Sequence, residues 1–250
     1  MTKPLQYGFA ERCGDAAYNR IQREKKAAKV ITILENAVGQ LGSHSLLDIG
    51  CSTGFMTHYY ARHFGRVVGT DIDLPALHHA SELGEQPNLS WSLMDSQQLA
   101  FSDQSFDVVT CTHIYEHVPD ADCLMSEIYR VLKPSGVCLF SAGNRLSLME
   151  PHYRLPLLSV IPKPMAHVYL KLFRRGDFYY ENHLSYWGLK RLVSAFLVDD
   201  YTLKVIEAPE KYHAEDVLIP GSRKQWIALA MLRTMYWLCP TYLWILRKIN

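Results

Sequence analysis

The chain has 250 residues, of which 48% are hydrophobic and 20% charged, so it can bury the core of one extended domain. This composition excludes a disordered, collagenous or coiled-coil protein. A net charge of +1 gives no sign of a strongly basic nucleic-acid binder. The six cysteines are scattered, with no C-x-x-C pair and no secretory leader, so we expect reduced thiols and a cytoplasmic protein.

The charged residues are unevenly distributed along the chain. Residues 1–40 contain 7 basic and 4 acidic residues, residues 48–130 contain 3 basic and 12 acidic, and residues 144–191 contain 8 basic and 3 acidic. An acidic block therefore lies between two basic ones. Such blocks can mark surfaces that meet different partners, or they can be solvated faces that differ by chance.

The apolar residues predict alternating helices and strands. Residues 20–38 have apolar residues at helical spacing and a basic polar face, which is typical of an amphipathic helix. Five strands and three helices are then predicted: strands at 45–49, 66–70, 89–94, 106–112 and 137–142, and helices at 55–64, 74–83 and 122–132. Short connections favour an α/β fold with a doubly wound, mostly parallel sheet and helices on both faces. Ligands of such sheets bind at the carboxyl ends of the strands.

The alternation is interrupted from Gly143 to Asn182 by a stretch rich in proline, aromatic and basic residues. It is too long for an ordinary connection, so we expect a partly helical lid over the ligand site. A helix at 185–196, capped by Ser185, and a strand at 202–207 resume the regular pattern.

The apolar run at 226–246 is nearly long enough to span a bilayer. Arg233 and Pro240 interrupt it, so no transmembrane segment is expected. A helix at 222–238 and a strand at 241–247, paired at the edge of the sheet, account for the same residues.

The first chemical motif is LLDIGCSTG, from Leu46 to Gly54, which predicts a strand, a glycine-containing turn and the start of a helix. Glycines let the backbone approach a ligand closely, and a helix N-terminus offers free N–H groups to an anion. A dinucleotide fingerprint would need glycine at positions 50, 52 and 55, where Gly50 alone fits, and no G-K-[ST] follows for a P-loop. A pyrophosphate ligand is therefore not favoured.

A series of motifs in a fixed order, from about Ser45 to Gly136, resembles the class I S-adenosylmethionine-dependent methyltransferases. The segments are Asp48-x-Gly50-x-Ser52-x-Gly54, Val68-Gly69-Thr70-Asp71-Ile72-Asp73, Asp95-Ser96, Phe106-Asp107-Val108-Val109, Glu116-His117-Val118-Pro119-Asp120 and Arg130-Val131-Leu132-Lys133-Pro134-Ser135-Gly136. Ser52 and Ser135 stand where glycine is more usual. The resemblance implies a seven-stranded Rossmann-like sheet and the cofactor S-adenosylmethionine, released as S-adenosylhomocysteine.

The resemblance also implies roles for individual residues: Asp71 would hold the ribose hydroxyls, and Asp95 would recognise the adenine amino group. A carboxylate can accept hydrogen bonds from both kinds of donor, although turns favour aspartate in any protein. The cofactor carries a carboxylate and no phosphate, so a turn with few glycines and one helix N-terminus suffices. The implied cofactor contacts are Asp48, Gly50, Cys51, Ser52, Gly54, Asp71, Ile72, Asp95, Ser96 and Thr112.

We expect a single domain with four parts. They are an N-terminal helical segment covering the site (1–44), a cofactor-binding core (45–143), an inserted lid that binds the acceptor (144–184) and the C-terminal part of the core sheet (185–250). The acidic block coincides with the core and the second basic block with the lid. An acidic acceptor bound under a basic lid is therefore one of the alternatives.

The pentapeptide His113-Ile114-Tyr115-Glu116-His117 fits the H-x-x-E-H pattern of inverted zinc peptidases. That chemistry needs both histidines on one helical face, but the pentapeptide directly follows a predicted strand and precedes Pro119. The sequence indicates no third ligand, so we expect no metal and no zinc hydrolase.

Methyl transfer mainly requires a nucleophile placed in line with the donated methyl group. A base is needed only where the acceptor atom is protonated, as in a hydroxyl. His113 and His117 follow the fourth predicted strand, where the acceptor should lie, and histidine can take a proton near neutral pH. His152 in the lid and His183 are further candidates. A Glu-His pair at this position is, however, common in the resembled family whatever the substrate.

The sequence therefore predicts a methyltransferase acting on a small or medium acceptor by in-line transfer, with oxygen favoured as the attacked atom. Cationic and aromatic residues in the lid suit a secondary metabolite, a sugar or glycan, or a lipid-like acceptor, but they also pack a lid onto a sheet. N- or C-methylation and a non-catalytic cofactor-binding scaffold remain alternatives. The basic lid allows peripheral membrane contact. No nucleic-acid partner is expected. The sequence does not indicate whether the protein is a monomer or an oligomer.

Overall fold

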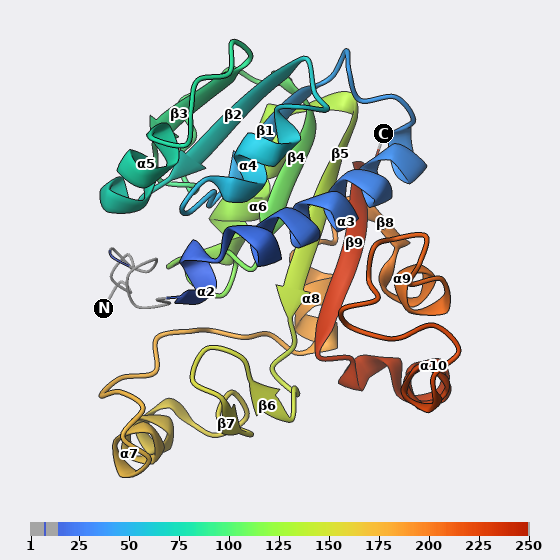
Figure 1. Ribbon diagram of the computed structural model, residues 1–250. Helices are drawn as coiled ribbons and strands as arrows, with labels where there is room; N and C mark the ends of the chain where they lie inside the picture. The colour runs from blue at the N-terminus through green and yellow to red at the C-terminus, as the bar shows by residue number, and fades with distance from the viewer. Residues whose placement is uncertain (1–7, 9–14, 250) are drawn as a thin grey trace.

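The computed structural model, which describes residue 8 and residues 15–249, is built around a seven-stranded sheet (Figure 1). The strands, in the order β3-β2-β1-β4-β5-β9-β8, are β1 (Ser45–Ile49), β2 (Arg66–Asp71), β3 (Leu89–Leu93), β4 (Phe106–Thr112), β5 (Leu132–Gly143), β8 (Phe196–Asp200) and β9 (Thr241–Lys248). Neighbours are parallel from β3 to β5, whereas β9 is antiparallel to both β5 and β8. The predicted seven-stranded, mostly parallel sheet is confirmed.

Helices follow most of the strands. They are α2 (Asp15–Tyr18), α3 (Arg20–Val38), α4 (Phe55–Tyr60), α5 (Leu74–Ser81), α6 (Ala121–Val131), α7 (Lys163–Leu172), α8 (Tyr186–Leu192), α9 (Thr202–Glu207) and α10 (Arg223–Met235), which runs into the short 3-10 helix η1 (Tyr236–Leu238). Several begin at a capping side chain. Asp120 accepts the first N–H groups of α6, and Ser185 and Ser222 cap α8 and α10 in the same way.

The two faces of the sheet bury separate cores because successive residues of a strand point to opposite faces. In β1, Leu46 packs into a core with α3, α4 and α9, whereas Leu47 packs into a core with α6 and α8. Val108 and Val109 of β4 divide in the same way. Helices therefore cover both faces, and Figure 1 shows α3 crossing one of them.

The predicted helix at 185–196 and strand at 202–207 are partly wrong. Helix α8 ends at Leu192, β8 forms the next strand, and residues 202–207 are helix α9. Asp200 marks the change, because its carboxylate accepts the N–H of Thr202 at 2.8 Å just as β8 ends and α9 begins. The apolar residues of 202–207 pack as a helix on the sheet.

Strand β9 is an interior strand, so the predicted pairing at the sheet edge is wrong. It lies between β5 and β8, with Ile245 opposite Leu139 on one side and Asp199 on the other. A strand inside a sheet is buried on both faces, which explains the apolar run at the C-terminal end. Among the described residues, no helix is long and apolar enough to cross a membrane.

The chain leaves the sheet after Gly143 and returns at Leu184, which forms a β-bridge with Asn144. We call residues 144–184 the lid. It contains α7 and a hairpin of β6 (Met149–Glu150) and β7 (Leu155–Pro156), which share a small apolar core of their own. Figure 1 shows the lid beyond the carboxyl end of β5, at the edge of the sheet where ligands of such folds bind.

Candidate functional site

The turn after β1 has a conformation that glycine favours. Gly50, Ser52 and Gly54 have φ angles of 70°, 52° and 77°, a region that costs a residue with a Cβ roughly 1–2 kcal/mol. A Cβ on Gly50 would lie 2.1 Å from Cδ1 of Ile114, and one on Gly54 would lie 2.5 Å from the Cβ of Ala80. Ser52 therefore bears a strain that glycine would avoid. A side chain at Gly54 would also meet the backbone of Ala80, and one at Gly50 would have to displace the side chain of Ile114.

Asp48, near the carboxyl end of β1, is a buried carboxylate. It accepts hydrogen bonds from the hydroxyls of Thr57 at 2.5 Å and Thr110 at 2.6 Å. Burial raises the pKa of Asp48 to about 6, although the two hydroxyls act in the opposite direction. A carboxylate whose pKa is raised in this way is typical of a functional position.

Asp71, at the end of β2, connects two turns. Its carboxylate accepts the N–H of Ser52 at 2.7 Å and the N–H of Asp73 at 2.9 Å. Burial raises the pKa of Asp71, and these backbone donors oppose that effect. A carboxylate has about four lone-pair positions, so Asp71 can still accept hydrogen bonds from a ligand.

A small cavity lies beside the turn after β1. Its lining consists of the predicted residues Asp48, Gly50, Cys51 and Thr112 together with Arg23, Thr53, Phe55 and Met56. The positive charge of Arg23, from α3, lowers the pKa of Asp48. Arg23 is not among the residues predicted from the sequence, although the basic face of the helix at 20–38 is a signal for it. Helix α2 also reaches this turn, since the Thr53 hydroxyl donates to the carbonyl of Ala17 at 2.8 Å.

The remaining predicted cofactor residues lie at the ends of neighbouring strands. Ile72 follows β2, and Asp95 and Ser96 follow β3 at the edge of the sheet. The carboxylate of Asp95 accepts the N–H and the side-chain amide of Gln97 at 2.9 and 3.1 Å. The structure thus brings the first two motifs together and places the third one strand farther out.

The residues after β4 form a turn, and the absence of a helix there agrees with the prediction from the sequence. The helical face that an inverted zinc peptidase needs is therefore not formed. His113 lies with Nδ1 3.3 Å from Oε1 of Glu116 and Nε2 3.3 Å from the hydroxyl of Ser141. Glu116 is fully buried. Burial opposes its ionisation, but His113 and the neighbouring histidines lower the pKa of Glu116 to about 2.

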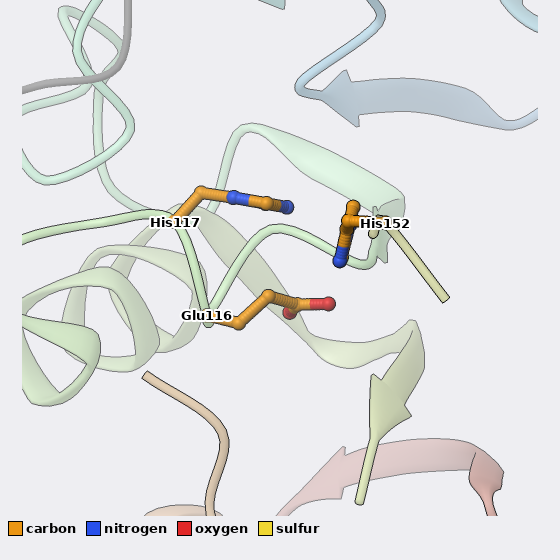
Figure 2. Close-up of side chains that lie close together, drawn as sticks. All are labelled: Glu116, His117 and His152. Carbon is orange, nitrogen blue, oxygen red and sulfur yellow. The ribbon is translucent and has the colours of Figure 1, made fainter. Parts of the chain in front are cut away.

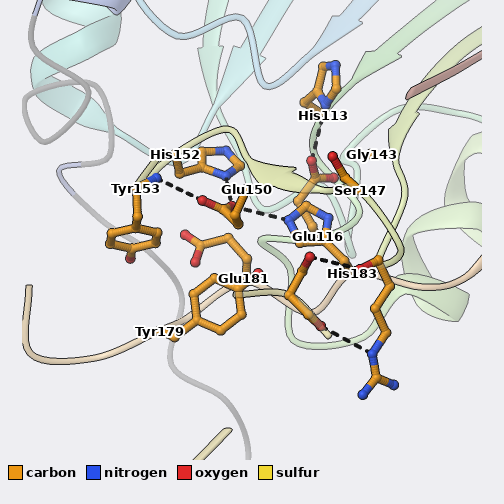
Figure 3. A network of polar contacts seen from close by, with 12 residues as sticks. His113, Glu116, Gly143, Ser147, Glu150, His152, Tyr153, Tyr179, Glu181 and His183 are labelled. Carbon is orange, nitrogen blue, oxygen red and sulfur yellow. Dashed lines mark hydrogen bonds and ion pairs between the residues drawn. The ribbon is translucent and has the colours of Figure 1, made fainter. Parts of the chain in front are cut away.

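The lid adds a second group of histidines around a carboxylate, which Figure 3 shows. Oε1 of Glu150 lies 2.7 Å from Nδ1 of His152 and 3.5 Å from Nε2 of His183. Burial opposes the ionisation of Glu150, but the two histidines lower its pKa to about 2. Burial also opposes the charging of His152, yet Glu150 outweighs this effect and raises the pKa of His152.

His117 lies between these two groups. Its Nδ1 is 3.9 Å from Oε1 of Glu181, and its ring centroid is 5.0 Å from that of His152. Figure 2 shows the side chains of Glu116, His117 and His152 converging. The structure therefore gathers the predicted catalytic histidines, from the turn after β4 and from the lid, around the buried carboxylates Glu116, Glu150 and Glu181.

The two carboxylates from the lid, Glu150 and Glu181, are not among the site residues predicted from the sequence. Glu150-Pro151-His152 and Glu181-Asn182-His183 are both E-x-H segments, and this repeated pair is the signal that could have found them. A loop has no periodicity that would place such segments on one face. The two E-x-H segments therefore indicate a site only once the fold shows that they lie close together.

A family model described as a methyltransferase domain matches residues 47–140. The match covers the turn after β1, the strands that flank it and the turn after β4. It ends before the lid, so it includes only the core half of the histidine and carboxylate cluster.

The chain is similar to ubiquinone biosynthesis O-methyltransferases. The protein from Coxiella burnetii (strain Dugway 5J108-111) is 32% identical over 114 residues, which are 45% of this chain and 48% of the relative. The protein from Psychrobacter cryohalolentis is 36% identical over 110 residues, or 42% and 43% of the two chains. The chain thus spans about half the length of these curated relatives.

Two solved structures share the fold. An S-adenosylmethionine dependent methyltransferase from Mesorhizobium loti has a TM-score of 0.58 at 16% identity, over 86% of this chain and 96% of that one. The plantazolicin methyltransferase BpumL, solved with S-adenosylhomocysteine and a monoazolic desmethylPZN analog, has a TM-score of 0.59 at 16% identity, over 94% and 87%.

Proposed function

Because the chain belongs to the class I S-adenosylmethionine-dependent methyltransferases, we propose that it methylates an oxygen atom of a small or medium acceptor held under the lid. The turn after β4 carries the proposal. Thr112 lines the cofactor cavity and Ile114 packs against Gly50, while Glu116 and His117 belong to the cluster. One short turn thus joins the small cavity beside the first motif to groups that can accept a proton.

S-adenosylmethionine supplies a methyl group on a positively charged sulfur. The buried carboxylate of Asp48 fits a cationic ligand, because a positive charge nearby offsets the cost of keeping this group ionised. Arg23, in the same cavity, provides a cation for the carboxylate of the ligand. Asp71 has lone pairs available for ribose hydroxyls, and Asp95 is the acceptor assigned to the adenine amino group.

His113 is assigned as the base that removes the proton from an acceptor hydroxyl. Glu116 lies beside Nδ1 and can fix the tautomer, which makes Nε2 the basic nitrogen; an acceptor hydroxyl would replace the Ser141 hydroxyl as its partner. The side chain of His113 is 42% exposed, whereas that of His117 is 12% exposed. An acceptor can therefore reach His113 more easily, and His117 is assigned to positioning the acceptor.

Two observations support oxygen as the attacked atom. The similar proteins are named O-methyltransferases, and a hydroxyl acceptor needs a base, whereas an unprotonated amine does not. The family match ends before the lid, so the acceptor class is inferred from the lid itself. Met165, Val168 and Leu172 of α7 are exposed next to Lys171, a combination that suits a lipid-like acceptor delivered from a membrane surface.

Calorimetry with S-adenosylmethionine and S-adenosylhomocysteine tests the donor site. We expect one binding site per chain. Asp71→Asn should weaken both ligands by about tenfold or more, since hydrogen bonds to charged groups contribute about 1.5–3 kcal/mol. Asp103→Asn is a matched control, because that carboxylate is 73% exposed, and it should bind like the wild type. An absence of binding would overturn the donor assignment.

Transfer of a labelled methyl group tests the reaction on a panel of phenols, sugars and phenolic lipids in vesicles. His113→Gln should lower turnover by roughly 10²–10⁴-fold, the usual contribution of a general base, with donor affinity unchanged. His78→Gln, at a side chain 75% exposed, should behave like the wild type. A label found on nitrogen or carbon, or full turnover in His113→Gln, would refute methylation of oxygen with this base, and no transfer at all would favour a binding protein.

A further inference from the structure

The lid half of the cluster has the composition and spacing of a metal site. The ligand atoms of Glu150, His152 and His183 all lie within 4.8 Å of one another, with separations of 2.7 and 3.5 Å from the glutamate oxygen to the two nitrogens. Ligand atoms of a tetrahedral zinc site, with bonds of about 2.0–2.1 Å, lie about 3.3 Å apart. The two separations fall on either side of this value, and Figure 3 shows the three side chains grouped together.

His183 is the residue that points to a ligand. Its side chain is 2% exposed, and neither ring nitrogen has a hydrogen-bond partner among the described residues. The 3.5 Å contact with Glu150 is longer than a good hydrogen bond. A buried polar group without a hydrogen-bond partner is destabilising, and a bound cation would use the lone pair of this imidazole.

The cluster also buries three carboxyl groups, each within 4 Å of a histidine nitrogen. The side chains of Glu116, Glu150 and Glu181 are 0%, 0% and 2% exposed. Buried charges are normally paired or bound to metal ions. A divalent cation held by Glu150 would add a second positive partner to the one that His152 provides.

We propose that Glu150, His152 and His183 bind one divalent d-block cation, represented in the test by zinc, and that this ion fixes the lid. Two imidazole nitrogens and one carboxylate oxygen suit zinc and the later first-row metals, whereas magnesium and calcium prefer oxygen ligands. Glu150 and His152 lie in the hairpin near the start of the lid, and His183 lies just before its end. The ion would therefore join the two ends of the lid, and the ring centroid of His117 lies 5.0 Å from that of the ligand His152.

A network of hydrogen bonds and ion pairs among the same residues is the competing explanation. It accounts for the short contact between Glu150 and His152, but it gives His183 no hydrogen bond and only the 3.5 Å contact of Nε2 with Glu150. It also predicts no stoichiometric metal, which separates the two explanations.

Zinc binding to the whole chain, without an affinity tag and after dialysis against a chelator, tests the proposal. Titration against a chromophoric zinc indicator should give one zinc per chain. Glu150→Gln and His183→Gln should each weaken zinc binding by more than about 100-fold, since changes outside the ligand set already cost 10–100-fold. His78→Gln removes an exposed histidine on α5 and should bind zinc like the wild type.

Cobalt(II) gives a readout that does not depend on the folding of the variants. In the wild type, the visible absorption bands of a cobalt site with nitrogen and oxygen ligands should saturate at one equivalent and disappear when zinc is added. Failure of the wild type to bind either metal, or equal binding by folded His183→Gln, would overturn the proposal in favour of the hydrogen-bonded network. These measurements use no S-adenosylmethionine, so their outcome is independent of the proposed methyl transfer.

Discussion

The cofactor side and the lid side of the molecule are built in different ways. On the cofactor side, one turn from Asp48 to Gly54 supplies much of the cavity lining through its backbone conformation. On the lid side, the cluster comes from side chains at 113–117, 150–152 and 181–183, which the fold brings together. A site contained in one turn leaves a recognisable motif, whereas a site assembled from three segments leaves only short residue pairs.

On the lid side, the charged residues of the interior are acidic, whereas many of those on the surface are basic. Residues 144–191 contain 8 basic and 3 acidic residues, yet Glu150 and Glu181 are both buried in the cluster. Several basic residues of the lid are exposed instead, namely Lys171, Arg174 and Arg175. The acidic acceptor that the sequence left open is therefore disfavoured, because the groups nearest the histidines are carboxylates.

Gly50→Ala should have the largest effect on the cofactor side. The new Cβ would lie 2.1 Å from Ile114 at a φ of 70°, so overpacking and backbone strain together should lower the free energy of unfolding by about 3 kcal/mol. Donor binding should be lost with it. Urea unfolding and calorimetry measure the two effects.

Gly42→Ala is the matched control for this substitution. Nothing lies within 4 Å of a Cβ built at Gly42, so the change in unfolding free energy should stay within about 0.5 kcal/mol. Equal effects of the two substitutions would mean that neither the packing nor the backbone conformation at Gly50 constrains the turn after β1.

Asp48→Asn should separate stability from function on the same side. Because folding raises the pKa of Asp48 to about 6, its stabilising contribution is complete below the unfolded pKa of about 4 and is lost as the pH rises through 6. The free energy of unfolding of the variant should therefore be higher than that of the wild type at pH 8, by on the order of 1–3 kcal/mol. Near pH 4 the two values should be equal. Its affinity for S-adenosylmethionine should fall.

Urea unfolding across this pH range, with calorimetry at pH 8, checks both expectations. Wild-type affinity for the donor should also fall as the pH drops below 6, because protonation removes the negative charge of Asp48. A stability difference between variant and wild type that does not change with pH would show that Asp48 does not titrate in this range.

Most of the fold around the cofactor could be predicted from the sequence because its signals are local. The helix at 20–38 and the strand at 45–49 have the predicted bounds, since apolar spacing and flanking residues decide them. The strand predicted at 202–207 failed because β8 forms only by pairing with β9, which lies far along the chain. Local patterns could not distinguish these two assignments.

The cluster at the lid depends on tertiary contacts that no local pattern contains. The hydroxyl of Tyr115 donates to the carbonyl of Gly143 at 2.5 Å and accepts the N–H of Leu184 at 3.1 Å. It thereby connects the turn after β4 to both ends of the lid. The position of His183 beside Glu150 follows from this connection and not from the spacing of the two residues in the sequence.

Tyr115→Phe should have the smallest effect of the three and should act on the lid side alone. It removes both hydrogen bonds while keeping the buried ring, so the unfolding free energy should fall by about 1–2 kcal/mol. The amide of Leu184 should exchange its hydrogen faster, with donor affinity unchanged. Tyr129→Phe, which removes a longer 3.4 Å contact near the C-terminus, should leave both unchanged. If Tyr115→Phe weakened donor binding as strongly as it exposed Leu184, the turn after β4 would couple the two regions, and the cofactor side could not be described by its local motif alone.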